Sequence, residues 1–193
     1  MRFPRIVGLL VPLALSCSAQ TPPGPLSVKE KLWFHAKTAY GPGTLVGIAA
    51  IAGYQELVKA PNEWKPGGAS YEQRLGYIGT LSGIRGVFGF GLDSALHEDP
   101  RYYRSTSTGF FRRAAHAVRG TVLTRTDSGG ETLSFWRLGS DYGAAFLSNT
   151  AYPDRLDRPH QGFLQGSEIM GVDLACNLGA EFWPDIRKTL FHR

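Results

Sequence analysis

Glycine residues recur at helical spacing in several parts of this sequence. The clearest series lies in residues 70–99, at steps of three, four and three: Gly76, Gly79, Gly83 and Gly86. Further small-residue pairs four positions apart are Gly43/Gly47, Gly139/Gly143, Gly162/Gly166 and Gly171/Ala175/Gly179. A glycine inside a helix costs about 1 kcal/mol relative to alanine, so its repeated use indicates a compensating gain from close helix–helix approach. The sequence therefore predicts an all-α fold, a compact glycine-rich bundle of about five to six helices.

Capping and breaking residues give the expected helix boundaries. Ser27 followed by Glu30 is a capping box at the start of the first helix. The expected helices are 27–41, 41–60, 70–99, 109–123, 131–151 and 161–182, the last ending before Pro184 with a short tail. A turn is expected at 126–130 and loops at 61–68 and 153–160. No segment alternates with period two, so no strand is predicted.

The N-terminal residues predict export from the cytoplasm. Arg2 and Arg5 precede an apolar run of about ten residues and a small-residue cleavage region, the pattern of a signal peptide over 1–19. In an alternative interpretation, "ALSC" is a lipobox and Cys17 carries a lipid. Residues 20–26 form a Pro-rich linker and 27–193 a single helical domain. The expected location is the periplasm or the outer membrane.

Composition excludes several functional classes. Loss of Arg2 and Arg5 with the signal leaves 19 basic against 16 acidic residues, a net charge of about +3, too low for a dedicated nucleic-acid binder. Cys176 is then the one remaining cysteine, expected to be a small buried hydrophobe. No GxSxG, Walker, CxxC, HxxxH or HExxH motif occurs, and we predict neither a metal site nor a cofactor.

The stretch "DSALHEDPRYYR" is the first candidate site. Asp93 and His97 are four residues apart and are expected to share a helix face. Together with Asp141 or Glu168 they could form an acid–base site. The alternative is a structural ionic cluster at a helix end, with Glu98 and Asp99 in the last helical turn. Polar residues inside apolar helices also predict a buried ionic network or a polar ligand cavity: Arg85, Asp93, Asp141, Glu168, Asp173 and Asn177.

Residues 101–125 form the second candidate site, with six arginines and no acid. In the expected helix, Phe111, Ala115, Val118 and Val122 fall on one face. Such a basic amphipathic helix suits an anionic membrane surface. The residues expected to make this contact are Arg101, Arg104, Arg112, Arg113 and Arg119. Alternatively, the arginines belong to an ordinary solvated face and pair with neighbouring acids.

Three motifs carry a resemblance to other proteins. "HEDPRYYR", the later "RTDSGG…LGSDYGAAFLSNTAYP" and the terminal "EFWPDIRKTLF" resemble a group of exported bacterial proteins of unknown function. The resemblance covers most of the chain after the signal. It implies an exported protein and carries over no activity, substrate or catalytic residue.

These observations favour a structural or interaction role for an exported envelope protein, at or near a membrane surface, with the Arg-rich segment as the contact. The expected partner is an anionic membrane surface or another envelope protein, and nucleic acid is not expected. One alternative is an envelope hydrolase that uses Asp93, His97 and either Asp141 or Glu168. Another is a carrier of lipid or of an apolar ligand, whose helices part around a cavity. The sequence leaves the oligomeric state open.

Overall fold

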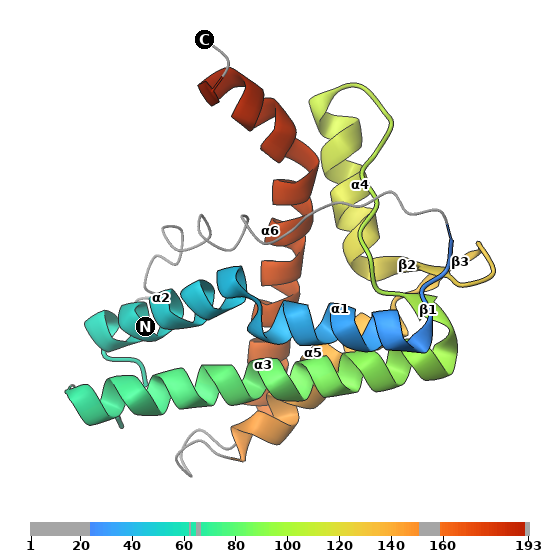
Figure 1. The fold of residues 1–193 in the computed structure, drawn as a ribbon. Coiled ribbons are helices and arrows are strands. Elements are labelled where there is room, and N and C mark those ends of the chain that lie inside the picture. Colours follow the sequence, from blue (N-terminus) through green and yellow to red (C-terminus); the bar gives the residue numbers. More distant parts are fainter. Residues whose placement is uncertain (1–23, 62, 65–66, 151–158, 192–193) are drawn as a thin grey trace.

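The computed structural model describes residues 24–61, 63–64, 67–150 and 159–191, and within them the chain is mainly helical (Figure 1). The helices are α1 (Val28–Tyr40), α2 (Pro42–Val58), α3 (Gly68–Leu96), α4 (Phe110–Val122), α5 (Phe135–Asn149) and α6 (Pro159–Phe191). The predicted all-α bundle of about five to six helices is confirmed. The expected signal peptide and the first part of the linker lie outside the described residues.

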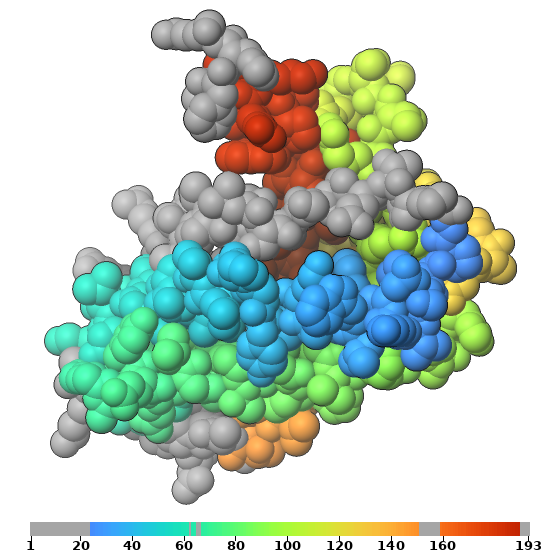
Figure 2. All heavy atoms as spheres, viewed as in Figure 1, coloured from blue at the N-terminus to red at the C-terminus, as the bar shows by residue number. Residues whose placement is uncertain are grey.

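Helix α3 is the central element of the bundle. Helices α1 and α2 follow one another along one side of α3, and α5 packs on another side (Figure 1). Helix α6 crosses this layer and packs against both α5 and α4. Helix α4 therefore stands beside the C-terminal part of α6 and projects from the layer formed by α1, α2 and α3 (Figure 2).

The helix ends follow the local signals. The Ser27 backbone N–H donates to Glu30 at 2.8 Å and the Glu30 N–H donates to Ser27 Oγ, which confirms the predicted capping box. Pro42 occupies the first turn of α2, where its missing N–H leaves no bond unmade. Helix α3 ends at His97, which adopts the left-handed conformation with φ of 55°. Glu98 and Asp99 therefore follow the helix instead of forming its last turn, a correction to the prediction.

Most of the predicted glycine contacts are present. Cβ atoms added at Gly83 and Gly86 would lie 2.1 Å from Tyr40 Oη and 3.3 Å from Ala39 Cβ, so both glycines let α1 approach α3. Gly139 and Gly143 are covered in the same way by α3, and Gly162 and Gly166 by α5. Gly76, Gly79 and Gly171 face open space, so the prediction is wrong for the first end of the stripe and for the start of the Gly171/Ala175/Gly179 set. Only the C-terminal half of α3 uses its glycines for close packing.

A small antiparallel sheet was not predicted. Its strands are β1 (Glu98–Asp99), β2 (Leu123–Thr126) and β3 (Glu131–Leu133), in that order. Strands of two to four residues are too short to display a period of two, which explains why the sequence pattern missed them. The predicted turn at 126–130 is the hairpin between β2 and β3, with Gly129 at φ of 88°. Because β3 takes up 131–133, α5 begins at Phe135 instead of at 131.

Helix α6 continues past the proline that was expected to end it. Pro184 lies inside α6, which extends to Phe191. A proline removes one helical hydrogen bond and crowds the preceding turn. The Glu181 carbonyl in that turn accepts hydrogen bonds from Arg104, at 3.2 Å, and from Arg113. These two arginines donate to the carbonyl one residue after that of Ala180, whose helical donor the proline lacks.

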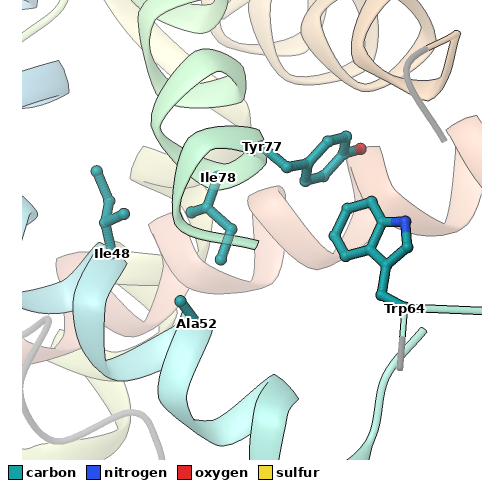
Figure 3. Close-up of a cluster of buried hydrophobic side chains, with 5 residues drawn as sticks. All are labelled: Ile48, Ala52, Trp64, Tyr77 and Ile78. Atoms are coloured by element: carbon teal, nitrogen blue, oxygen red, sulfur yellow. The ribbon is translucent and has the colours of Figure 1, made fainter. Parts of the chain in front are cut away.

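The apolar core is small and lies between α2 and α3. It consists of Ile48, Ala52, Trp64, Tyr77 and Ile78 (Figure 3). Elsewhere the interior is dominated by charged side chains that are buried with partners. The largest fully buried side chains are those of Arg74, Lys31, Glu98, Glu181, Asp93 and Asp141. Such an interior is stable only when each charge is compensated, which makes the ion pairs the main determinants of how the helices meet.

Candidate functional site

A cavity of about 480 Å³ lies between helices α1, α2, α3 and α6. The lining contains six aliphatic side chains of α2, α3 and α6, which together are called its apolar end: Ile48, Ile51, Ile78, Leu81, Ile169 and Val172. It also contains polar and charged groups, called its charged or cationic end, with the aromatic Phe34 and Trp136 among the same lining residues: Lys37, Arg85, Arg101, Arg137, Asp173 and Asn177. Ile78 and Arg85 are seven positions apart on α3, about 10 Å along the helix axis, so this helix has an apolar section and a charged section.

The half-buried Arg85 and the buried Arg137 form the charged end of the cavity. Arg85 donates to Asp141 and to Asp173, each at 2.6 Å. Arg137 Nε lies 3.0 Å from an Asp173 oxygen without the alignment of a hydrogen bond. The Arg137 guanidinium also donates to two carbonyls of α4, at 3.0 and 3.1 Å. The cluster therefore joins α3, α4, α5 and α6 through two cations and two carboxylates.

Burial perturbs the charges of this cluster. It raises the pKa of Asp141 to about 6, although Arg85 opposes the rise. It lowers the pKa of Arg137, which Asp173 only partly counteracts. For Arg85, burial also acts to lower the pKa, but Asp173 and Asp141 together outweigh it and raise the pKa. Arg137 is thus the cation with the weakest compensation.

Among the described residues, the cavity lining contains four cations and one carboxylate: Lys37, Arg85, Arg101, Arg137 and Asp173. Asp141 and Asp99 lie outside the lining and pair with Arg85 and Arg101, so the excess is one positive charge. Asp141 accepts a hydrogen bond from Arg85 and does not itself line the cavity. Its second oxygen accepts no hydrogen bond within the described residues. Cys176 also lines the cavity and is half-buried, so it is less buried than expected. The arrangement suits a molecule with an apolar body and a negatively charged group.

The expected acid–base residues have separate partners. Asp93 is fully buried and lies 2.7 Å from Nε2 of His35 on α1. The side chain of His97 is 79% exposed, and its nearest carboxylate is that of Asp127, at 3.7 Å. Because His97 is the left-handed residue after α3, it does not share a helix face with Asp93.

The other two expected acids also lie apart. Asp141 belongs to the arginine cluster, whereas Glu168 is exposed on α6. Two of the four residues are buried in different ion pairs and two are exposed, so the structure does not bring them into one open cleft.

The five arginines expected to contact a membrane divide into two groups. Arg101 pairs with Asp99 at 2.6 Å, and its side chain is 7% exposed. Arg113 pairs with Glu181 and Asp185, and Arg104 donates to the Glu181 carbonyl. These three therefore bind the loop before α4, and α4 itself, to the rest of the protein.

The remaining two arginines point outward. Arg112 is exposed, and Arg119 is exposed but pairs with Glu131 at 2.5 Å. The prediction that all five arginines form one contact face is therefore not met by the positions of Arg101 and Arg113.

Sequence reasoning missed three buried residues that organise this region. Glu98 accepts the backbone N–H groups of Phe135 and Trp136 and so caps α5 from outside that helix. Glu181 is fully buried and accepts hydrogen bonds from Tyr102 and Arg113. His35 supplies the partner of Asp93. The sequence offered a weak signal for the two glutamates, since both belong to the quoted motifs "HEDPRYYR" and "EFWPDIRKTLF".

The described residues offer neither a metal site nor a membrane-spanning helix. Among the described residues, no group of three His, Cys, Asp or Glu side chains is placed to hold a metal ion. In the same part of the chain, no helix combines the length and the hydrophobicity needed to cross a membrane.

Comparison with known proteins gave no relative: no protein-family model, no curated protein and no solved structure matches the chain. The resemblance to exported bacterial proteins therefore stays a prediction.

Proposed function

We propose that this protein is an exported envelope protein that binds a single-chain amphipathic molecule, such as a fatty acid, in the cavity between α1, α2, α3 and α6. The observation that carries the proposal is a lining that combines aliphatic side chains with a group of cations, in successive sections of α3. Its volume of about 480 Å³ lies within the ~300–1,000 Å³ usual for small-molecule sites.

The apolar end would hold the hydrocarbon chain. Ile51 and Leu81 come from α2 and α3, and Ile169 comes from α6 on the opposite wall. Each methylene group that leaves water for such a surface gains about 0.8 kcal/mol. A chain of a dozen or more carbons would therefore supply most of the binding free energy.

The cationic end would hold the negatively charged head. Arg137 is 5% exposed and only partly compensated by Asp173, so a carboxylate or phosphate beside it would add the missing negative charge. Among the described lining residues Lys37 is the one lysine, and it lies on the exposed side of α1, so it can adjust its position to the head. Charge complementarity at this end would orient the ligand.

The proposed role needs no catalytic residue. Asp93 and His97 have different partners, and Glu168 is exposed, so the positions of these residues do not favour the hydrolase alternative. The carrier alternative requires an enclosed, mostly apolar cavity; the lining is mostly apolar, which favours it, although the cavity is open on one side.

The test compares two ligands that differ only in the head. Binding of palmitate and of hexadecanol to the purified protein is measured by displacement of a fluorescent fatty acid. We expect Ile51→Trp to fill the apolar end and to abolish binding of both ligands. Leu57→Trp is the matched control, because Leu57 lies on the same helix and is 82% exposed. We expect this variant to bind like the wild type.

A second variant tests the cationic end. Lys37→Gln removes one lining charge and should weaken palmitate binding about fivefold while leaving hexadecanol binding unchanged, as expected for about 1 kcal/mol of charge attraction. The proposal fails if neither ligand binds, or if Ile51→Trp binds both as the wild type does. If Lys37→Gln weakens the binding of palmitate and of hexadecanol equally, the assignment of the charged head to the cationic end is refuted.

A further inference from the structure

We propose that the outer face of α4 docks on an anionic lipid surface. Its exposed apolar stripe is Phe111, Ala115, Val118 and Val122, spaced by four, three and four residues. Phe111 is 84% exposed and Val118 50% exposed. Large apolar side chains in a continuous exposed row on one helix mark an interaction surface.

The opposite face of α4 fixes how this stripe is presented. Ala117 and Thr121 are buried against the protein, and Arg113 is held by Glu181 of α6. Phe110 stacks on Phe182 of α6 with ring centroids 5.0 Å apart. These contacts anchor the inner face, so the exposed stripe is held outward and is not available to bury itself in the core.

The charges around the stripe indicate the occupant. Residues 101–125 contain six arginines and no acid. Arg112 lies next to Phe111, is exposed, and carries no ion pair within the described part of the chain. Arg119 lies next to Val118 and is 62% exposed, although it pairs with Glu131 at 2.5 Å. Apolar side chains flanked by arginines are the composition of helices that lie in the interface of anionic membranes.

The C-terminal end of α6 adds charge at the same end of the molecule. It projects in the same direction as the N-terminal end of α4 (Figures 1 and 2). Arg187 and Lys188 are exposed there, whereas the exposed Asp185 is paired with Arg113. Two copies of such a cationic face would repel each other, which favours an anionic lipid over a second copy of the chain.

This inference goes beyond ligand binding and does not depend on it. The two are connected through the segment before α4, because Arg101 and Tyr102 line the cavity.

Co-sedimentation with vesicles tests the proposal. The purified protein is mixed with phosphatidylcholine vesicles that contain or lack phosphatidylglycerol, at low and high salt. We expect binding only to the anionic vesicles and less of it at high salt. Arg112→Gln with Arg119→Gln should weaken binding by about fivefold per arginine, and Phe111→Ser by about tenfold or more.

Matched control variants test whether a loss of vesicle binding is specific to α4. Leu57→Ser changes an equally exposed apolar residue on α2, and Lys29→Gln with Lys59→Gln removes two exposed charges elsewhere. We expect these variants to bind vesicles as the wild type does. Absence of binding, or equal binding by the α4 variants, overturns the proposal.

One outcome would assign the surface differently. In that outcome, the wild type forms a concentration-dependent dimer that Phe111→Ser converts to a monomer, while neither protein binds vesicles. That result would mean that the stripe binds a second copy of the chain, and it would refute the lipid assignment. Palmitate binding is measured without vesicles and should be unchanged in Phe111→Ser. Failure of vesicle binding and failure of ligand binding are therefore distinguishable.

Discussion

The same substitution at two glycines of α3 should change stability in opposite directions. At Gly76 an added Cβ meets no heavy atom within 4 Å, whereas at Gly89 it would lie 2.6 Å from Cε1 and 2.8 Å from Nδ1 of His35. Both positions gain about 1 kcal/mol of helix propensity when glycine becomes alanine. For Gly76→Ala that gain is the whole expected effect.

At Gly89 the contact outweighs the gain in propensity. Carbon atoms pack at about 3.5–4.0 Å, so the His35 ring would have to move by about 1 Å. His35 is 4% exposed and is packed edge-on against Phe34 and Trp136, with ring centroids 5.4 Å apart in each pair. Its movement would break the 2.7 Å contact with fully buried Asp93. An uncompensated buried charge costs about 3–5 kcal/mol, which leaves a net loss of about 2–4 kcal/mol.

Urea unfolding of the two variants measures the difference. We expect Gly76→Ala to raise the free energy of unfolding by about 1 kcal/mol and Gly89→Ala to lower it by about 2–4 kcal/mol. The unfolding slopes should be unchanged, since the same surface is exposed on unfolding. Equal stabilisation by the two changes would refute the reasoning, because it would mean that α1 does not hold His35 against Gly89.

Two further predictions concern buried acids. Burial raises the pKa of Asp141 to about 6, so the folded protein binds a proton at this carboxylate more tightly than the unfolded chain does. The free energy of unfolding of the wild type should therefore rise by ~1 kcal/mol, relative to that of Asp141→Asn, as the pH falls from 7 to 5. A pH-independent difference between the two urea curves would contradict this. Glu98→Ala leaves the N–H groups of Phe135 and Trp136 without an acceptor and should cost about 2 kcal/mol in thermal unfolding. The control Glu131→Ala removes only an exposed ion pair with Arg119 and should cost under ~0.5 kcal/mol. Equal losses would mean that Glu98 does not cap α5.

Local patterns predicted the helices better than the sites. The capping box at Ser27 and the packing glycines at Gly83 and Gly86 lie where the sequence placed them. The pairing of Asp93 with His97 was not found, because the chain leaves the helical conformation at His97. A spacing of four residues predicts a shared face only while the helix continues. The partner of Asp93 is His35, 58 residues away, and no local pattern connects the two.

For residues 101–125, too, the sequence predicted the helix but not the contacts of its arginines. Its composition predicted a basic amphipathic helix, and α4 is one. Which arginines point outward depended on α6, because Glu181 and Asp185 draw Arg113 inward and leave Arg112 exposed. The sequence contained these acids but not their distance from α4.

The sequence by itself determined the helical class, most helix boundaries and the use of glycine for close packing. These properties depend on residues within about four positions of one another, where hydrogen bonding and side-chain direction are set by the helix itself. Only the tertiary structure decided that Gly76 faces open space, that Glu98 caps α5, and that Arg85 and Arg137 meet Asp173 at one end of a cavity. The partner of a buried charge depends on which helices cross, because that crossing brings together residues far apart in the chain.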